Sequence, residues 1–504
     1  MGFMNEIKNE ASKVLTENGA VGYSTTGKAL VDFNFKLPSY RGDKNLLMKD
    51  FTAIVDERDP YLLKYLFYLR DCREGLGERD AFRRTIVKAL RATTLTDEEK
   101  QHVIYMIPVF GRWDDLLAFV DTEFENVAFE IIRDQFELDA ANMLENKSVS
   151  LLAKWLPSDN ASSKQSRYAA HKLARYLGVT VREYRSAVVA LRKYLDVTEV
   201  KTCANEWDEI DYNKVSSNAN LRYMRAFLKH DEDRRREYLA ALERGDENVV
   251  MHSATNFPHD VVHKYIENNW RISSYDAAIE ALWNNLPDMP GLNDTLVVRD
   301  GSGSMESTIS GSSVTALDVA DAITLYCADR CRGEFKNQFI TFSSRPEFVS
   351  VVNCKTLHDK LEYLHTYDDC SNTDLEATFD LIIRAAVNGN MKQEELPKQI
   401  LIISDMEFDQ ISYHYSNNKF KVLMEEISNT FKAAGYTMPK LVFWNVNSRT
   451  NTIPMKENAA GVLLVSGFSV NTINMVLSGK FSAYEAIVDT LEKERYNEIP
   501  YAKF

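Results

Sequence analysis

Apolar residues recur every three or four positions along most of the first 290 residues. Charged residues occupy the opposite face of these segments, for example 59–70, 79–91, 164–177, 181–195 and 219–243. This spacing is typical of amphipathic helices that bury one face. Glycine and proline are sparse inside these segments, and no repeat of fixed length stands out. The pattern therefore predicts a stack of helices in which any repeat is degenerate.

The pattern changes after residues 284–293, a linker-like segment with two prolines and a glycine. Short apolar runs now alternate with helical segments. The runs are 294–300, 338–343, 398–404, 440–446 and 461–465, and the helical segments are 313–331, 355–365, 374–389, 418–434, 469–478 and 481–495. Such alternation is typical of a mostly parallel sheet covered on both faces. We expect an α plus α/β chain, with a helical domain over 1–288 and a doubly wound α/β domain over 289–504.

Residues 20–37 are an exception within the helical half. Apolar and polar residues alternate around 29–37, which predicts a short hairpin or an extended arm. The segment from Gly22 to Lys28 has the spacing of a phosphate-binding P-loop. However, Ala29 stands where a P-loop has the Ser or Thr that binds magnesium, and the alternation after it predicts a strand where a P-loop opens a helix. We therefore do not expect nucleotide binding here.

Composition narrows the class of protein. The chain has 504 residues, 60 basic and 74 acidic, and a net charge of −14, so it is not a general polycation for coating nucleic acid. Its six cysteines form no Cys-x-x-Cys pair, which favours reduced thiols. The N-terminus carries no secretory signal, and no apolar run approaches the roughly 18 residues of a membrane span. We expect a soluble cytoplasmic protein without membrane contact.

Oxygen-bearing side chains gather where the predicted parallel strands end. Asp300 closes the first strand and is followed by Ser302 and Ser304, whose hydroxyls point the same way in an extended loop. Asp405 closes the run 399–404, and Thr373 lies in a loop just before the helical segment 374–389. Carboxylates and hydroxyls form a hard ligand set that suits Mg²⁺. The sequence therefore predicts a site for Mg²⁺ or another divalent cation from Asp300, Ser302, Ser304, Thr373 and Asp405.

This pattern resembles the metal-ion-dependent adhesion site of von Willebrand factor A domains. The resemblance rests on Asp300-x-Ser302-x-Ser304, the Thr373 loop and Asp405 after an apolar strand. It implies that these side chains bind the cation directly or through water and that the sixth position takes an acidic oxygen of a partner. Acidic neighbours such as Asp374 and Glu407, with Asp368, Asp369 and Asp409, are expected to make the rim negative.

Four segments of the helical half resemble the TROVE module of Ro ribonucleoproteins and of an uncharacterised plant and viral branch built on the same plan. They are 15–36, 67–84, 107–117 and 255–265. The resemblance implies a HEAT-like repeat ring that binds single-stranded RNA ends and structured small RNA. A TROVE-like half followed by an adhesion-site domain matches the Ro architecture.

One stretch carries the charge that RNA binding requires. Residues 164–193 contain eight Lys or Arg residues and a single acid, Glu183, with tyrosines interleaved. Phosphate neutralisation and base stacking are the main terms in such binding. The candidate RNA-binding residues are Lys164, Arg167, His171, Lys172, Arg175, Arg182 and Arg185. A solvated helix face whose tyrosines pack in the core explains the same pattern equally well.

No catalytic constellation emerges, so we do not expect an enzyme. His259 and His263 mimic a zinc-protease motif, but Asp260 replaces its glutamate and no third ligand follows, which favours packing histidines. Two functions remain. The first is a Ro-type RNA-binding ribonucleoprotein, for small-RNA scaffolding or RNA quality control, with a metal adhesion site. The alternative is a metal-dependent protein-interaction scaffold without RNA.

Overall fold

A computed structural model describes residues 7, 10–16, 21–267, 271–289, 291–309, 312–367, 374–407, 419–454, 462–480 and 482–504. The chain divides into two compact units, each made from two separate segments. We call 1–57 with 256–493 the sheet unit, and 58–255 with 494–504 the helical unit.

The sheet unit contains all the described strands. Its strands are β1 (Lys13–Leu15), β2 (Val21–Tyr23), β3 (Thr295–Asp300), β4 (Gln338–Phe342), β5 (Phe348–Ser350), β6 (Gln399–Ser404), β7 (Lys440–Asn445) and β8 (Val462–Ser466). Its helices are α2 (Ala29–Phe35), α3 (Leu37–Tyr40), α4 (Lys44–Glu57), α15 (Pro258–Val262), α16 (Ala277–Asn284), α17 (Ala316–Arg330), α18 (Leu357–Leu364), α19 (Leu375–Asn388), α20 (Lys419–Ala433), α21 (Ile473–Leu477) and α22 (Ala483–Leu491).

Six strands form the main sheet in the order β5-β4-β3-β6-β7-β8. All neighbours are parallel except the edge strand β5, which runs antiparallel to β4. Every residue of β3 and β8 is buried, which explains their continuous apolar character. The five predicted strands are confirmed, and each of their ends lies within one residue of the prediction. The three-residue strand β5 was not predicted.

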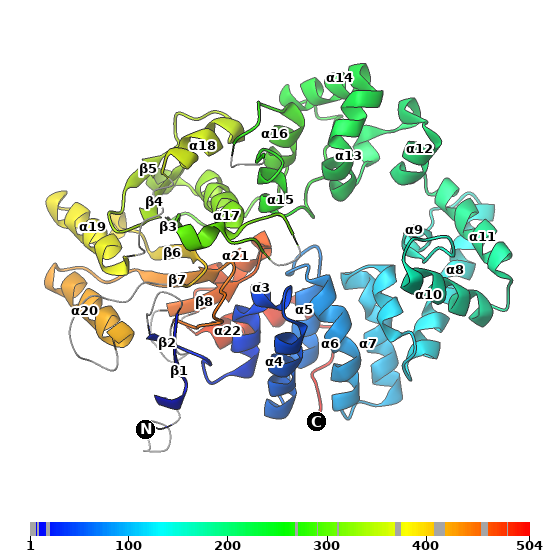
Figure 1. The fold of residues 1–504 in the computed structure, drawn as a ribbon, viewed down its shortest axis with the longest axis horizontal. Coiled ribbons are helices and arrows are strands. Elements are labelled where there is room, and N and C mark those ends of the chain that lie inside the picture. The colour runs from blue at the N-terminus through cyan, green and yellow to red at the C-terminus, as the bar shows by residue number, and fades with distance from the viewer. Residues whose placement is uncertain are drawn as a thin grey trace. The chain divides into compact units, whose positions relative to one another are not determined.

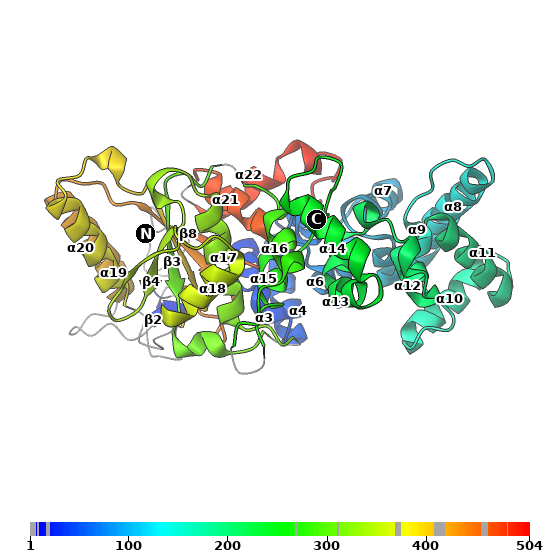
Figure 2. The same ribbon diagram turned by 90° about the horizontal axis from the view of Figure 1, so that it is seen from above.

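Helices cover both faces of this sheet. α17 packs on β3, β4 and β6, while α19 packs on β4 and against α20. Figures 1 and 2 show α19 and α20 together on one side of the sheet and α17 on the other. A capping box between Thr315 and Asp318 fixes the start of α17. The α plus α/β prediction is confirmed at this level, and the strand order is that of doubly wound α/β folds.

The predicted domain boundary at 288/289 does not coincide with the compact units. Residues 21–57 pack on the sheet because the last residues of two strands bond to α2. Asn445 Nδ2 donates to the Phe35 carbonyl at 2.7 Å, and the Ser466 hydroxyl donates to the Asn34 carbonyl. Residues 256–288 join the same unit. In that segment Trp283 Nε1, for example, donates to Asp329 of α17 at 2.9 Å.

Residues 29–37 are helical, so the prediction of a hairpin or extended arm there is wrong. α2 is buried on every side, and its polar Asp32 accepts hydrogen bonds from the Thr25 and Thr26 hydroxyls and the Thr26 amide. A helix without an exposed face has no amphipathic period to detect. A hairpin does exist, but it pairs β1 with β2 just before this helix.

The helical unit consists of helices and short 3₁₀ turns in its described residues. Its helices are α5 (Leu62–Arg70), α6 (Arg79–Ala92), α7 (Asp97–Phe110), α8 (Glu125–Leu144), α9 (Leu152–Trp155), α10 (Lys164–Tyr176), α11 (Val181–Tyr194), α12 (Thr198–Ala204), α13 (Ser217–His230) and α14 (Glu232–Glu243), with the 3₁₀ helix η1 (Trp113–Phe119) after α7. Neighbours in sequence pack as pairs, such as α5 with α6 and α10 with α11. The predicted helix 219–243 is two helices that meet at Asp231.

Residues 494–504 return to the helical unit as its last segment. Arg495 pairs with the buried Asp71 that follows α5, and the Ala502 amide donates to the Pro60 carbonyl at 2.8 Å. Among the described residues, no helix combines the length and the hydrophobicity that a membrane span requires.

Candidate metal centre and basic helical surface

Two carboxyl groups lie at the end of the sheet where the order in which the chain adds strands reverses. β3 and β6 are parallel neighbours, and the chain continues from β3 toward β4 on one side and from β6 toward β7 on the other. Ligands of doubly wound sheets bind at such a switch point, at the carboxyl ends of the strands. Asp300 is the last residue of β3 and Asp405 follows β6. Their exposed fractions are 0% and 1%.

Asp300 and the two serines form one hydrogen-bonded group. The Ser302 amide donates to Asp300 Oδ1 at 2.9 Å, and the Ser404 hydroxyl donates to Asp300 Oδ2 at 2.5 Å. The Ser302 and Ser304 hydroxyl oxygens lie 3.0 Å apart, as their two-residue spacing predicts. Two hydroxyls and a carboxylate thus converge at one end of β3.

Asp405 carries an oxygen that the described residues leave without a hydrogen bond. Its Oδ1 accepts from the Glu407 amide at 3.1 Å, whereas its Oδ2 is buried and unpaired. Arg449 is the cation that approaches Oδ2, at 3.9 Å, which exceeds hydrogen-bonding distance. An unpaired buried carboxylate oxygen is costly unless a cation or a proton compensates it.

Burial changes the acidity of both carboxyl groups. It raises the pKa of Asp300, and it raises the pKa of Asp405 to about 7, with the negative charge of Asp300 as the next cause. The next residue, Met406, has a φ of 65°, in the left-handed region that a side chain rarely adopts. Strain of this kind concentrates at functional sites.

The donor set fits a small hard cation. Two carboxylates would balance the charge of Mg²⁺, and the serine hydroxyls supply neutral oxygens at the same strand end. The described residues contain no group of three or more His, Cys, Asp or Glu side chains arranged for a metal, so a cation here would depend on the hydroxyls. Thr373, the fifth predicted ligand, lies outside the described residues.

The roles of two residues of this centre were not predicted from the sequence. Ser404 is hidden inside an apolar strand, although it holds Asp300. Glu407 does not belong to an acidic rim, because it is 2% exposed and binds the loop after β7. It accepts hydrogen bonds from the Arg449 amide at 3.0 Å and from the Thr450 amide at 2.9 Å.

The other predicted rim acids differ in role. Asp374 caps the start of α19 by accepting from the Ala377 amide at 2.9 Å. Asp368, Asp369 and Asp409 lie outside the described residues. The described acids therefore serve structural roles, and the prediction of a negative rim is wrong for Glu407.

The predicted RNA-binding residues fall on α10 and α11, but three of them have local partners. Lys172 Nζ lies 2.6 Å from Asp121 Oδ1 and 2.5 Å from Glu125 Oε2. Arg185 pairs with Asp159, with Nε 2.7 Å from Oδ1. Arg167 donates to the carbonyl of Ser162 at 2.9 Å. Their charges or donors are largely satisfied within the unit.

The other four, Lys164, His171, Arg175 and Arg182, are exposed and make no ion pair with any described residue. The tyrosines expected to stack on bases are mostly engaged. Tyr184 is buried and donates to the Pro157 carbonyl at 2.8 Å, and Tyr176 packs on Phe129 with ring centroids 5.4 Å apart. Tyr168 is half exposed and donates to Asp121.

The histidines of the zinc-like motif are packing residues, as their sequence context indicated. His259 is buried beside Phe257 and Phe468, with ring centroids 5.4 Å from each. His263 lies 3.0 Å from the Asp318 carboxylate and 2.9 Å from the Ser313 hydroxyl.

Comparison with known proteins finds relatives without an assigned function. Residues 294–502 match a domain of unknown function, DUF7788, and residues 159–288 match another, DUF2828. The chain is also 26% identical over 528 positions to an uncharacterised protein of Acanthamoeba polyphaga mimivirus, a similarity that covers 97% of this chain and 89% of the viral protein. The two matched regions meet between 288 and 294, close to the boundary that the sequence pattern suggests.

Proposed function

We propose that this protein is a divalent-cation-dependent binding protein of the adhesion-site type. The buried Oδ2 of Asp405, to which no described residue donates a hydrogen bond, carries the proposal, together with Asp300, Ser302 and Ser304 at the switch point of the sheet. These side chains hold Mg²⁺ or a similar cation, and the cation takes an acidic oxygen of a partner protein. Because the two carboxylates cancel the charge of the ion, they do not repel that oxygen strongly.

The finer fold assignment belongs to the same proposal. A von Willebrand factor A-like sheet unit agrees with the strand order, the antiparallel edge strand and the position of Asp300-x-Ser302-x-Ser304 after β3. A HEAT-like, TROVE-like helical unit agrees with the paired packing of α5 to α14.

Cation binding is tested with Asp405→Asn. The amide keeps the shape of the side chain but removes its charge, so we expect loss of Mn²⁺ binding in calorimetry and loss of the rise in Tm that Mg²⁺ gives the wild type. Without metal, the variant should be as stable as the wild type or more stable, because a buried carboxyl beside Asp300 has been neutralised.

The matched control is Asp294→Asn, which removes the charge of an aspartate directly before β3, at the end of the sheet away from Asp300, where it pairs with Lys398. It should bind Mn²⁺ like the wild type. Equal Mn²⁺ binding by Asp405→Asn and Asp294→Asn, or no binding by the wild type, would contradict the metal centre.

RNA binding is the second candidate, and it rests on the exposed Lys164, Arg175 and Arg182, which make no ion pair with a described residue. We expect Arg175→Gln with Arg182→Gln to weaken binding of a hairpin RNA with a single-stranded 3′ end, and to lower the slope of log affinity against log salt by about 1 to 2. Fluorescence anisotropy at two salt concentrations measures both. The control, Arg222→Gln with Arg225→Gln, removes two exposed arginines of α13. An equal effect of both pairs would refute a specific surface on α10 and α11.

A further inference from the structure

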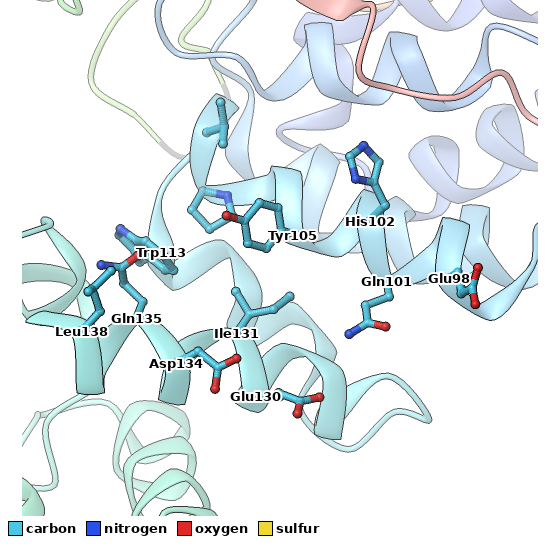
Figure 3. A pocket seen from close by; sticks show the side chains of 12 residues that line it. Glu98, Gln101, His102, Tyr105, Trp113, Glu130, Ile131, Asp134, Gln135 and Leu138 are labelled. Atoms are coloured by element: carbon cyan, nitrogen blue, oxygen red, sulfur yellow. The ribbon is translucent and has the colours of Figure 1, made fainter.

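A groove in the helical unit has no role in the proposed metal centre or RNA surface. It is a cavity of about 740 Å³ between α7, α8 and the 3₁₀ helix η1. α7 contributes Glu98, Gln101, His102, Tyr105, Pro108 and Val109, and α8 contributes Glu130, Ile131, Asp134, Gln135 and Leu138. Figure 3 shows the side chains of the two helices facing each other, with Trp113 of η1 at one end.

The groove exposes large apolar side chains to solvent. Tyr105, Val109 and Leu138 have exposed fractions of 60%, 46% and 54%. Tyr105 and Val109 lie four residues apart on one face of α7, and α8 adds the exposed Leu138. Exposed apolar surface concentrated in one concave place, with polar residues around it, marks a binding site for a partner.

The charge of the lining is one-sided. The described residues that line it include three acids, Glu98, Glu130 and Asp134, and no Lys or Arg. Arg133 offsets part of this charge from the solvent side of α8, 3.1 Å from Glu130 and 2.7 Å from Asp134. Glu98 has no ion pair with a described residue. The groove is therefore complementary to a cation and repels nucleic acid.

The protein itself shows how such a surface of this unit binds a segment. Residues 494–504 dock on α5 and α7 with one basic residue at each end of the contact, Arg495 on Asp71 and Lys503 on Glu99. Between them Tyr496 stacks on Phe110, with ring centroids 5.6 Å apart, and the groove residue His102 holds the Glu498 carbonyl at 2.9 Å. Basic residues and aromatic anchors thus cover the side of α7 adjacent to the groove.

We propose that the groove between α7 and α8 binds a basic segment of a partner protein that carries large apolar anchors. A short amphipathic helix fits this chemistry: its apolar face lies on Tyr105, Val109 and Leu138, and its Lys or Arg side chains reach Glu98, Glu130 and Asp134. The proposal is independent of the metal centre and of RNA binding.

The test uses the full chain and random 16-residue peptides displayed on phage. We expect selection to enrich Lys- or Arg-containing peptides with large apolar residues three or four positions apart. A synthetic enriched peptide should lose about tenfold or more in affinity for Leu138→Glu and for Glu98→Lys, measured by fluorescence polarisation. Both side chains are exposed, so the variants should fold, and circular dichroism checks this.

Matched controls lie on α8 and are not among the residues that line the groove. Leu144→Glu changes a leucine that is 81% exposed, and Glu137→Lys reverses an exposed acid of α8. Both should bind the peptide like the wild type. Enrichment of no peptide, enrichment of acidic peptides, or equal losses in the groove and control variants would overturn the proposal.

Discussion

His259 shows what burial does to a single titratable side chain. Burial lowers the pKa of His259 to about 4, and the positive charge of Arg41 and His263 acts in the same direction, while Asp260 and Asp318 oppose it. The described residues leave its Nδ1 without a hydrogen bond. The folded protein therefore keeps this ring neutral at pH values where an exposed histidine, with a pKa near 6.5, takes up a proton.

This difference predicts a pH dependence of stability. Because the folded pKa lies below the unfolded one, the contribution of His259 is complete above about pH 6.5 and is lost as the pH falls toward 4, by about 3 kcal/mol in total. His259→Phe, which fits between Phe257 and Phe468, should flatten the free energy of unfolding over this window in denaturant titrations. The exposed His171→Gln should leave the wild-type dependence intact, and an unchanged slope in His259→Phe would contradict the argument.

At the candidate centre, the sequence was informative only where chemistry and spacing coincide. Asp300, Ser302, Ser304 and Asp405 stand at strand ends, and the parallel topology brings them to one edge. Ser404 was missed and Glu407 was misjudged because their roles depend on contacts with distant segments, Asp300 for Ser404 and Thr450 for Glu407. On α10 and α11, the basic count was visible, but the acids that neutralise Lys172 and Arg185 come from other segments of the chain, Asp121 and Asp159.

At the scale of elements, the spacing of hydrophobic residues predicts the amphipathic helices and the continuously apolar strands. The strands β3, β4, β6, β7 and β8 and the helices α6, α10, α11, α19 and α20 match the predicted ranges closely, whereas the predicted helix 219–243 is α13 and α14. The hydrophobic pattern fails to predict two kinds of element. The edge strand β5 is too short for a period, and α2 buries all seven residues, so burial on every side hides its helical spacing. Its Asp32 carboxylate accepts from the Thr26 hydroxyl inside the unit, and the backbone carbonyl of Asn34 accepts from the Ser466 hydroxyl.

At the scale of the whole molecule, the division of the chain follows packing and not sequence order. Each compact unit contains a segment from a distant part of the sequence, a fact that no local pattern encodes. The segment 494–504 completes the helical unit mainly through Arg495 on Asp71, a carboxylate with no exposed side-chain area that also accepts from the Tyr496 hydroxyl at 3.2 Å.

Removing the positive charge of Arg495 should therefore destabilise the helical unit. Arg495→Ala leaves the buried Asp71 without its charge partner, and we expect a loss of about 3 kcal/mol in the free energy of unfolding. Lys503→Ala breaks the exposed pair with Glu99 and should cost much less, because water screens the two charges. Adding Asp71→Asn to Arg495→Ala should restore part of the loss. Equal costs for Arg495→Ala and Lys503→Ala in denaturant titrations would disprove this account.

The bond between Asn445 and Phe35 has a consequence for how the protein is made. Its two residues are 410 positions apart in the chain. At about 5–20 residues per second, translation needs about 20 to 80 s to supply the strand that α2 packs on. Throughout that time α2 can pack on α4, but the part of its surface that contacts the sheet and α22 has no native partner. The first helices of the sheet unit are therefore made well before the strand ends to which they bond.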